Sequence, residues 1–181
     1  MNGDDRELLR QFKQPGQKEK AFTVIIKKYQ EKLYWHIRRM VVEHEDANDI
    51  LQNMFIKVWN SLENFREDSQ LYTWLYRIAT NESLTFIEQL KRRSSVSLSD
   101  VEDNLGNKIK ADENFDGNKL EWKLQLAMQK LPAKQRIVFN LRYYDEMPYE
   151  EMSRVLETSE GALKASYHHA AKKIEDFILN R

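Results

Sequence analysis

Several residue types that build common functional sites are scarce or missing in this sequence. The 181-residue chain has no cysteine, only 5 glycines and only 3 prolines. Without cysteine there are no disulfides, cysteine metal ligands or cysteine nucleophiles. So few glycines and prolines argue against glycine-rich phosphate-binding loops and turn-rich β-sandwiches. No apolar run approaches the roughly 20 residues of a membrane-spanning helix, and the first residues lack the apolar stretch of a secretory signal. We therefore expect a cytoplasmic protein without membrane insertion.

Charge is balanced overall but unevenly distributed. The chain has 29 basic and 29 acidic residues. Residues 1–93 carry 16 basic and 14 acidic groups, residues 94–118 carry 2 and 6, and residues 119–181 carry 11 and 9. Tight unassisted DNA binding usually shows a strong basic excess, because affinity follows the number of phosphates neutralised. Any contact with nucleic acid should therefore be local, or supported by a partner.

Apolar residues recur every three or four positions through both end blocks, which is the period of a helix face. The clearest stripe covers residues 46–62, and another covers residues 71–93, where Asp68 or Ser69 is expected to cap the helix. Residues 94–118 lose this period and gain serine, aspartate and asparagine, as in an extended linker. The period returns over residues 120–178. We predict an all-α protein with two small helical domains, 1–93 and 119–181, joined by a flexible acidic linker, 94–118.

The last two predicted helices, residues 148–156 and 159–178, have the proportions of a helix-turn-helix. A helical wheel turns one side of the second helix outward: Gly161, Ala165, His168 and Lys172, flanked by Lys164, Ser166 and His169. Small residues next to lysine and histidine let a helix lie deep in a major groove. Ser159 as N-cap would direct backbone N–H groups toward a phosphate.

An ordinary helical hairpin with a solvated face is the alternative interpretation of this segment. A metal site is not expected, because neighbouring helix positions such as His168 and His169 point about 100° apart and no third ligand is suitably spaced.

A second segment, residues 65–81, interleaves aromatic rings with hydrogen-bond donors. These side chains are Phe65, Tyr72, Trp74, Tyr76, Arg77 and Asn81. Aromatic rings stack on unstacked bases, and donor-bearing side chains read the exposed base edges. In the alternative interpretation, Trp74 and Tyr76 belong to the core and rim of a helical bundle.

The chain resembles the extracytoplasmic-function sigma factors, which are small two-domain promoter-specificity subunits of bacterial RNA polymerase. The resemblance spans residues 8–178 and rests on short motifs in the family's order. These are D-A-x-D-I-x-Q-x-x-F-x-x-V-W, F-R-x-x-S, T-W-L-Y-x-I-A-x-N, a basic run, an acidic linker, L-P-x-x-x-R-x-V-F-x-L-R and S-E-G-A-L-K-A.

The resemblance implies three sets of binding residues. Docking on the polymerase clamp maps to Asp46, Asp49, Gln52, Asn53, Phe55 and Trp59. Melting of the −10 promoter element and capture of a flipped base map to Phe65, Arg66, Ser69, Thr73, Trp74, Arg77 and Asn81, followed by the basic Arg92 and Arg93. Reading of the −35 element maps to Ser159, Gly161, Ala162, Lys164, Ala165, Ser166, His168 and His169.

Three positions depart from the family pattern. Glu67 stands where glycine is common and would repel a phosphate, Thr85 stands where many members have aspartate, and His169 replaces a common arginine. A histidine carries a switchable charge in place of a permanent one. These departures affect the promoter sequence that is read rather than the role.

The resemblance also implies the partners: core RNA polymerase, promoter DNA and, in many members, an anti-sigma factor. A stand-alone helix-turn-helix regulator is the alternative function, and a helical adaptor that binds only protein is a third. An enzyme is not expected, because the four histidines form no triad and no paired carboxylates mark a cleft. No cofactor is expected.

Overall fold

The computed structural model describes residues 3–41, 43–93 and 119–179, and in these ranges every regular element is a helix. The elements are α1 (Gly3–Phe12), α2 (Lys18–Val41), α3 (His44–Ser61), η1 (Leu62–Asn64), α4 (Leu71–Arg93), α6 (Lys119–Gln129), α7 (Ala133–Tyr143), α8 (Tyr149–Leu156) and α9 (Glu160–Leu179). The predicted all-α fold is confirmed. The predicted linker, residues 94–118, lies outside the described residues.

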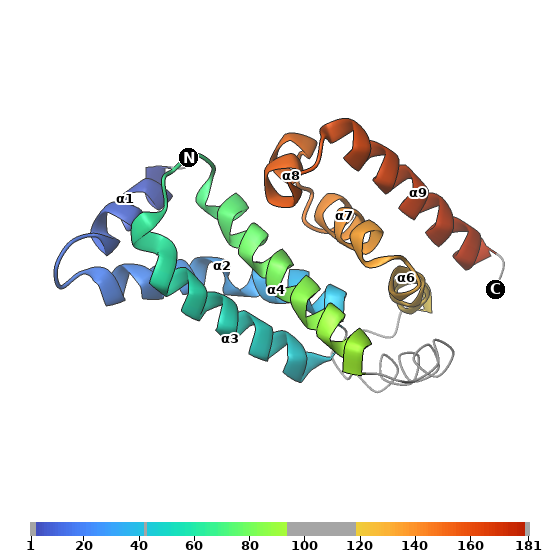
Figure 1. Cartoon of the computed structure of the whole chain (residues 1–181), viewed down its shortest axis with the longest axis horizontal. Coiled ribbons are helices and arrows are strands. Elements are labelled where there is room, and N and C mark those ends of the chain that lie inside the picture. Colours follow the sequence, from blue (N-terminus) through green and yellow to red (C-terminus); the bar gives the residue numbers. More distant parts are fainter. Residues whose placement is uncertain (1–2, 42, 94–118, 180–181) are drawn as a thin grey trace.

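The first four α-helices form what we call the N-terminal bundle, which occupies the left and lower part of Figure 1. Helix α2 runs through its centre and packs against α1, α3 and α4. Its inward side chains, among them Ile25, Leu33 and Ile37, are fully buried against residues such as Met54 and Leu75. Each buried Leu, Ile or Met side chain contributes about 1.5–3 kcal/mol through apolar burial. Because these side chains recur at the helical period, one side of α2 faces the core.

Helices α6 to α9 form what we call the C-terminal bundle. Its own small core consists of Ala127, Met128, Leu131, Phe139, Ala170 and Ile174. The Phe139 ring stacks on the Tyr143 ring at 5.0 Å and on the Tyr167 ring at 5.6 Å. The second contact joins α7 to α9, and helices α8 and α9 follow each other within one residue of the limits predicted for the helix-turn-helix.

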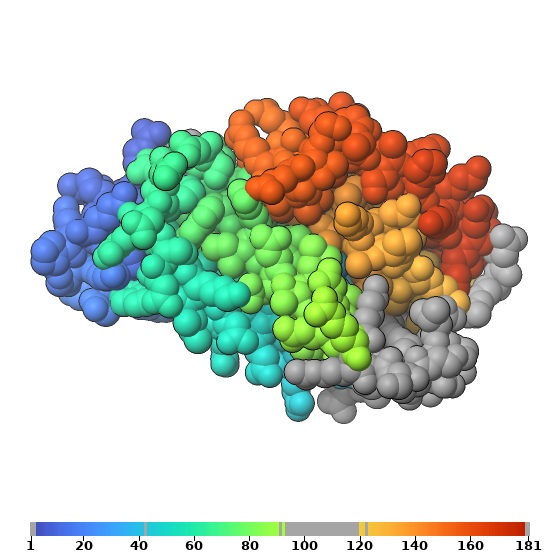
Figure 2. Space-filling model, in the orientation of Figure 1, coloured from blue at the N-terminus to red at the C-terminus, as the bar shows by residue number. Residues whose placement is uncertain are grey.

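The two bundles pack against each other through a shared core. Buried side chains of α7, α8 and α9, including Ile137, Met152 and Leu163, belong to the same hydrophobic cluster as those of α2 and α4. Helix α8 lies on α4, and α7 lies on α2. The space-filling view shows the C-terminal bundle seated directly on the green α4 segment (Figure 2). The described bundles therefore form one packed body in this conformation.

The helix ends follow the sequence signals in one case and depart from them in another. At the start of α9 the Ser159 hydroxyl accepts a hydrogen bond from the Ala162 N–H at 3.4 Å, which confirms the predicted N-cap. At the start of α4 the predicted cap by Asp68 or Ser69 is wrong. The helix begins at Leu71, so Gln70 occupies the cap position and its carbonyl accepts the Trp74 N–H at 3.2 Å.

Three glutamates of the described chain adopt a left-handed backbone. They are Glu67 with φ of 61°, and Glu146 and Glu157 with φ of 50° each. This conformation suits glycine and is strained for a residue with a Cβ. Glu67 occupies the position where the resemblance notes a frequent glycine, so the chain keeps the turn there without the usual residue.

Candidate nucleic-acid and polymerase interfaces

The outward side of α9 is exposed as the helical wheel predicts. We call Gly161, Lys164, Ala165, His168 and His169 the α9 face; all five are exposed. The opposite side of the helix is buried. A Cβ added at Gly161 would meet nothing within 4 Å, so no part of the described protein requires glycine there. The face is open for another molecule to approach closely.

Several charged or polar groups border the α9 face. Lys164 Nζ lies 3.4 Å from Glu160 Oε2 and 5.5 Å from the centre of the Tyr149 ring. The His168 and His169 rings lie 6.0 Å apart. Ser159 and Ala162 are exposed, and Ser166 is half-buried. Lysine and histidine donors therefore lie on the N-terminal half of the helix, and at its first turn the backbone dipole also favours anions.

On α4, Thr73, Arg77 and Asn81 lie four residues apart and share one side of the helix, which we call the α4 face. Two of the three contact carboxylates from the C-terminal bundle. The Thr73 hydroxyl donates to Glu151 Oε2 at 2.5 Å, and Thr73 is only 2% exposed. The Arg77 guanidinium donates to Glu157 in an ion pair. Asn81 is exposed.

The aromatic residues near the α4 face are mostly packed inward. Phe65 is 8% exposed, and its ring lies 5.0 Å from that of Trp74, which is half-buried. Tyr76 is buried, and its hydroxyl donates to Asp145 Oδ1 at 3.3 Å. Burial and this carboxylate raise the pKa of Tyr76. The core-and-rim interpretation therefore describes Tyr76 in this conformation, while Trp74 retains an exposed part.

The remaining residues that the resemblance maps to the −10 element surround this side of the N-terminal bundle. Arg66 and Arg92 are exposed, and Ser69 is half-buried, with its hydroxyl donating to the Gln70 carbonyl at 3.3 Å. The side chain of Arg93 lies outside the part of the chain that the structure describes.

A polar strip runs along the outer side of α3. Asp49, Gln52 and Asn53 are exposed, and Asp46 is half-buried. Ile56, one turn beyond Gln52 and Asn53, is 60% exposed, although sequence reasoning missed it. We call Asp49, Gln52, Asn53 and Ile56 the α3 face. A signal was present in the sequence, because Ile56 falls outside the apolar stripe of its helix.

Phe55 and Trp59, predicted for the same docking surface, pack inward instead. Phe55 is 8% exposed, and its ring contacts Phe22 at 6.2 Å. The Trp59 ring contacts Phe12 at 5.4 Å and Phe22 at 5.0 Å. These two side chains anchor α3 to α1 and α2; Trp59 is half-buried, and the part of both residues in docking stays a prediction.

A buried polar network joins the two bundles beneath these surfaces. His36 of α2 is fully buried; its Nδ1 lies 2.8 Å from Asp145 Oδ2 and its Nε2 lies 3.0 Å from Thr80 Oγ1. The Asn140 side-chain amide donates to the His36 carbonyl at 2.9 Å. Arg39 Nη1 lies 3.7 Å from Asp145 Oδ1. Because Asp145 is an acceptor, Nδ1 carries the hydrogen and the Thr80 hydroxyl can donate to Nε2.

Arg136 of α7 binds backbone carbonyls on both sides of this junction. Its guanidinium donates to Met128 at 3.1 Å, to Gln129 at 2.8 Å and to Met40 of α2 at 2.9 Å. Burial lowers the pKa of Arg136 to about 10, so the guanidinium remains charged at neutral pH. A half-buried cation that donates to several carbonyls holds α6, α7 and the end of α2 in one geometry.

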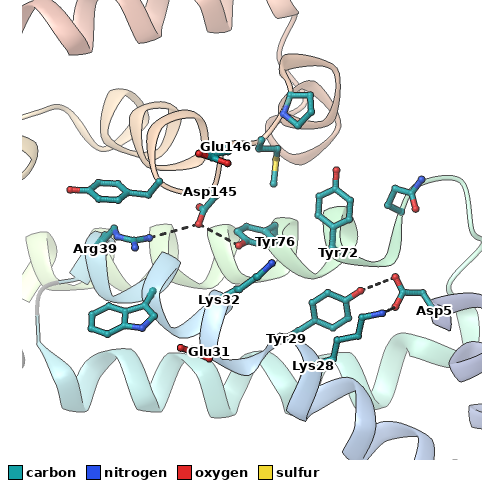
Figure 3. A pocket seen from close by; sticks show the side chains of 15 residues that line it. Asp5, Lys28, Tyr29, Glu31, Lys32, Arg39, Tyr72, Tyr76, Asp145 and Glu146 are labelled. Atoms are coloured by element: carbon teal, nitrogen blue, oxygen red, sulfur yellow. Dashed lines mark hydrogen bonds and ion pairs between the residues drawn. The ribbon is translucent and has the colours of Figure 1, made fainter. Parts of the chain in front are cut away.

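A groove of about 790 Å³ opens along the junction of the bundles. Figure 3 shows two groups that converge on carboxylates in its walls: Lys28 and Tyr29 on Asp5, and Arg39 and Tyr76 on Asp145. Lys28 Nζ and the Tyr29 hydroxyl each donate to Asp5 at 2.7 Å. The walls are thus aromatic rings with internally paired charges.

Among the described residues, no group of three or more histidine, aspartate or glutamate side chains is arranged to hold a metal ion. None of the described helices is long and apolar enough to cross a membrane.

Family models match both bundles. Residues 25–93 match "Sigma-70 region 2", and residues 121–174 match "Sigma-70, region 4". The RNA polymerase sigma-H factor of Pseudomonas aeruginosa is 32% identical over 94% of this chain and 92% of its own. The ECF RNA polymerase sigma-E factor of Escherichia coli is 30% identical over 88% of this chain and 87% of its own.

Solved structures share the fold. CnrH, solved with the cytosolic domain of CnrY, superposes with a TM-score of 0.70 at 22% identity over 97% of both chains. The sigma factor RpoE of Bartonella quintana, solved with the anti-sigma factor NepR, superposes with a TM-score of 0.66 at 19% identity over 88% of this chain and 97% of that one. Family models on both bundles and relatives that match nearly end to end assign the chain to the sigma-70 family of RNA polymerase sigma factors, within the extracytoplasmic-function group.

Proposed function

We propose that three helix faces divide the work of a sigma factor in this chain. The α3 face docks on core polymerase, the α4 face with the loop at residues 65–69 holds the opened −10 element, and the α9 face reads the −35 element in the duplex. The open space around Gly161 supports the assignment of the α9 face, because the backbone of a helix that binds in a DNA groove must come close to the bases. The exposed Ile56 supports the first, because it places one apolar side chain among the exposed polar residues of the α3 face, as in an interface with an apolar centre and a polar rim.

The charge of the chain fits a protein that acts through a larger assembly. Opening a duplex costs a few kcal/mol per unstacked step, and a chain with net charge +0 offers few phosphate contacts in return. Core polymerase supplies those contacts. The sigma factor then adds the selective ones, which are donors to base edges and rings against unstacked bases.

We further propose the domain limits 1–93 and 119–181 and a cytoplasmic, non-catalytic role beside the polymerase. An anti-sigma factor is a proposed partner, because CnrH was solved with the cytosolic domain of CnrY and RpoE with the anti-sigma factor NepR. A stand-alone helix-turn-helix regulator would leave the α3 face without a role, which makes it the weaker candidate.

The test is transcription from genomic DNA fragments by purified core polymerase, with and without this protein, followed by mapping of transcript starts. We expect a set of new start sites that share two upstream sequence elements. Ile56→Ala should weaken binding to core polymerase about tenfold, whereas Val24→Ala, which truncates another exposed aliphatic side chain on α2, should not. The absence of new start sites, or equal effects of the two variants, would contradict the proposal.

A further inference from the structure

Two neighbouring histidines of the α9 face lie well behind the first turn of the helix. His168 follows Gly161 by seven residues, so it shares that side of the helix and lies about 10 Å further along the axis. His169 is next to it, and both side chains are exposed. A recognition helix contacts base edges with its N-terminal residues, and the major groove is about 8.5 Å deep. A helix that enters the groove by its first turn therefore brings both imidazoles to the rim, where the phosphates lie.

The charges next to the two imidazoles on α9 are positive. Lys164 and Lys172 lie four residues before and four residues after His168, and both are exposed. The acidic side chain at the start of the helix, Glu160, lies 3.4 Å from Lys164 Nζ. The two imidazole rings lie 6.0 Å apart, and within the described residues neither is bonded to a carboxylate.

The helices packed against α9 add no carboxylate at this place. Their titratable groups that approach α9 are cations and phenols: Arg142 and Tyr143 of α7, Tyr149 of α8, and Lys130, which directly follows α6. Lys173, on the far side of the histidines, lies 3.0 Å from the uncharged Gln135. In the free protein, the described surroundings of the two imidazoles therefore offer no anion to a bound proton.

DNA would change these surroundings. A histidine ordinarily gains or loses its charge between pH 5 and 8. Neighbouring cations disfavour the charged form of an imidazole, and an opposite charge within about 4–6 Å favours it. Phosphates at the rim of the groove supply that opposite charge. Protonation of imidazoles at this place and DNA binding therefore favour each other.

We propose that His168 and His169 take up protons from the solvent when the α9 face binds duplex DNA, and that they then contact its phosphates. Binding consequently strengthens as the pH falls through neutrality, and the protons return to the solvent when the DNA leaves. The inference rests on the proposed function of the α9 face and adds the chemistry of two of its residues. The remainder of the face, with Lys164, binds in the same way across this range of pH.

The test measures the affinity of the full chain for a short fluorescent duplex of mixed sequence, by anisotropy at low ionic strength between pH 8 and pH 6. Mixed sequence suffices because phosphates carry no sequence information. The variant His168→Gln with His169→Gln keeps polar side chains that bind no proton. The variant His168→Arg with His169→Arg carries permanent charges. His44→Gln is the control, because it removes another exposed histidine, on α3.

We expect the affinity of the unmodified protein and of His44→Gln to rise about tenfold from pH 8 to pH 6. The double glutamine variant should keep the low affinity of pH 8 throughout, and the double arginine variant should keep the high affinity of pH 6. A purely structural role of the histidines would not give opposite effects in the two variants. Thermal unfolding checks that each variant is folded.

Salt dependence separates contacts with phosphates from contacts with bases. The slope of log affinity against log salt concentration steepens by about 0.9 for each phosphate neutralised. We expect it to steepen by about 0.9–1.8 between pH 8 and pH 6 in the unmodified protein and to stay constant in the double glutamine variant. Equal pH dependence in these two proteins would overturn the proposal, and so would a pH dependence with a constant salt slope.

Lys164→Ala distinguishes failure of this proposal from failure of the proposed function. If the α9 face does not bind DNA, Lys164→Ala binds the duplex as tightly as the unmodified protein at every pH, and both proposals fail. If the face binds DNA without proton uptake, Lys164→Ala weakens binding, but the double glutamine variant retains the pH dependence of the unmodified protein. Only the role of the two histidines is then wrong.

Discussion

The α4 face and the α9 face both carry hydrogen-bond donors, but they differ in how far these donors are exposed. Lys164 and His168 of the α9 face are exposed. Thr73 of the α4 face is 2% exposed, and Arg77 is paired with Glu157. The difference arises from the packing partner, because α8 covers α4 while the outer side of α9 has no described element on it. One proposed promoter-binding surface is thus fully exposed, whereas the other has its first residue, Thr73, covered.

The comparison implies an order of events. The α3 face and the α9 face are accessible in this conformation. The proposed contacts with polymerase and duplex DNA can therefore form while Thr73 is still covered. A molecule that binds the open form better than the closed form shifts the equilibrium by its difference in affinity. Binding of a polymerase that separates the bundles would therefore activate the α4 face.

The largest predicted effect comes from a substitution that weakens the junction between the two bundles. Arg136→Ala removes a guanidinium that satisfies carbonyls of α2 and α6 and the segment after α6. Leaving those acceptors buried without a donor should lower the free energy of unfolding by about 3 kcal/mol. The measurement is urea denaturation followed by circular dichroism. Lys134→Ala, at an exposed position of the same helix, is the control; equal losses in the two variants would argue against the role of Arg136.

The second prediction tests whether the α4 face and the α9 face have different roles. Lys164→Ala should weaken binding of duplex carrying the upstream element about tenfold. Asn81→Ala should leave duplex binding unchanged and slow promoter opening about tenfold. Footprinting measures the first effect, and a fluorescent base at the −10 element measures the second. Identical footprints and opening rates for both variants would show that the two faces do not divide the work.

The third prediction concerns the loop that leads to α4. Glu67→Gly removes a strained left-handed residue and a carboxylate beside the proposed −10 contacts. We expect the free energy of unfolding to rise by about 0.5–1 kcal/mol, and promoter affinity in the polymerase complex to rise about twofold. Glu146→Gly relieves similar strain away from that loop, so it should stabilise without raising affinity. A gain in affinity from both glycine variants would point to stability alone as the cause.

The smallest predicted effect is a change in stability at alkaline pH, and it is absent at neutral pH. Burial raises the pKa of Tyr144 to about 12, and the Arg39 guanidinium lies 4.1 Å from the ring centre. The unfolded chain ionises this phenol near pH 10, so the unfolded state binds fewer protons between pH 10 and 12 and stability falls as pH rises there. Tyr144→Phe should reduce this loss of stability between pH 10 and 12, measured by urea denaturation at each pH. Tyr143→Phe, at the more exposed neighbour, is the control. An unchanged slope would exclude Tyr144 as its source.

The helical period explains why so much of the fold could be predicted from the sequence. Stripes such as that of residues 46–62 depend only on local spacing, and the inward side of α9 with the Ser159 cap depends on residues within one or two turns. The cap of α4 was predicted wrongly because two plausible residues lie just before the actual boundary. The roles of the binding residues stay predictions.

The cover over the α4 face could not be predicted in this way. Thr73 and Glu151 are 78 residues apart, and His36 and Asp145 are 109 apart. No periodicity relates such pairs, and glutamates such as Glu151 and Glu157 are common on solvated helix surfaces. Their role becomes visible only when the two bundles are placed against each other.

The most direct test of the account locks the bundles together across the groove. Lys32 and Glu146 are exposed and line the groove from α2 and from the turn after α7. With cysteines at both positions, a cleavable bifunctional thiol reagent can hold the two bundles in this packed conformation. We predict that the linked protein fails to open promoters with core polymerase and regains activity once the linker is cleaved. Equal transcription by the linked and cleaved forms would contradict the claim that the two bundles must separate for the proposed faces to act on a promoter.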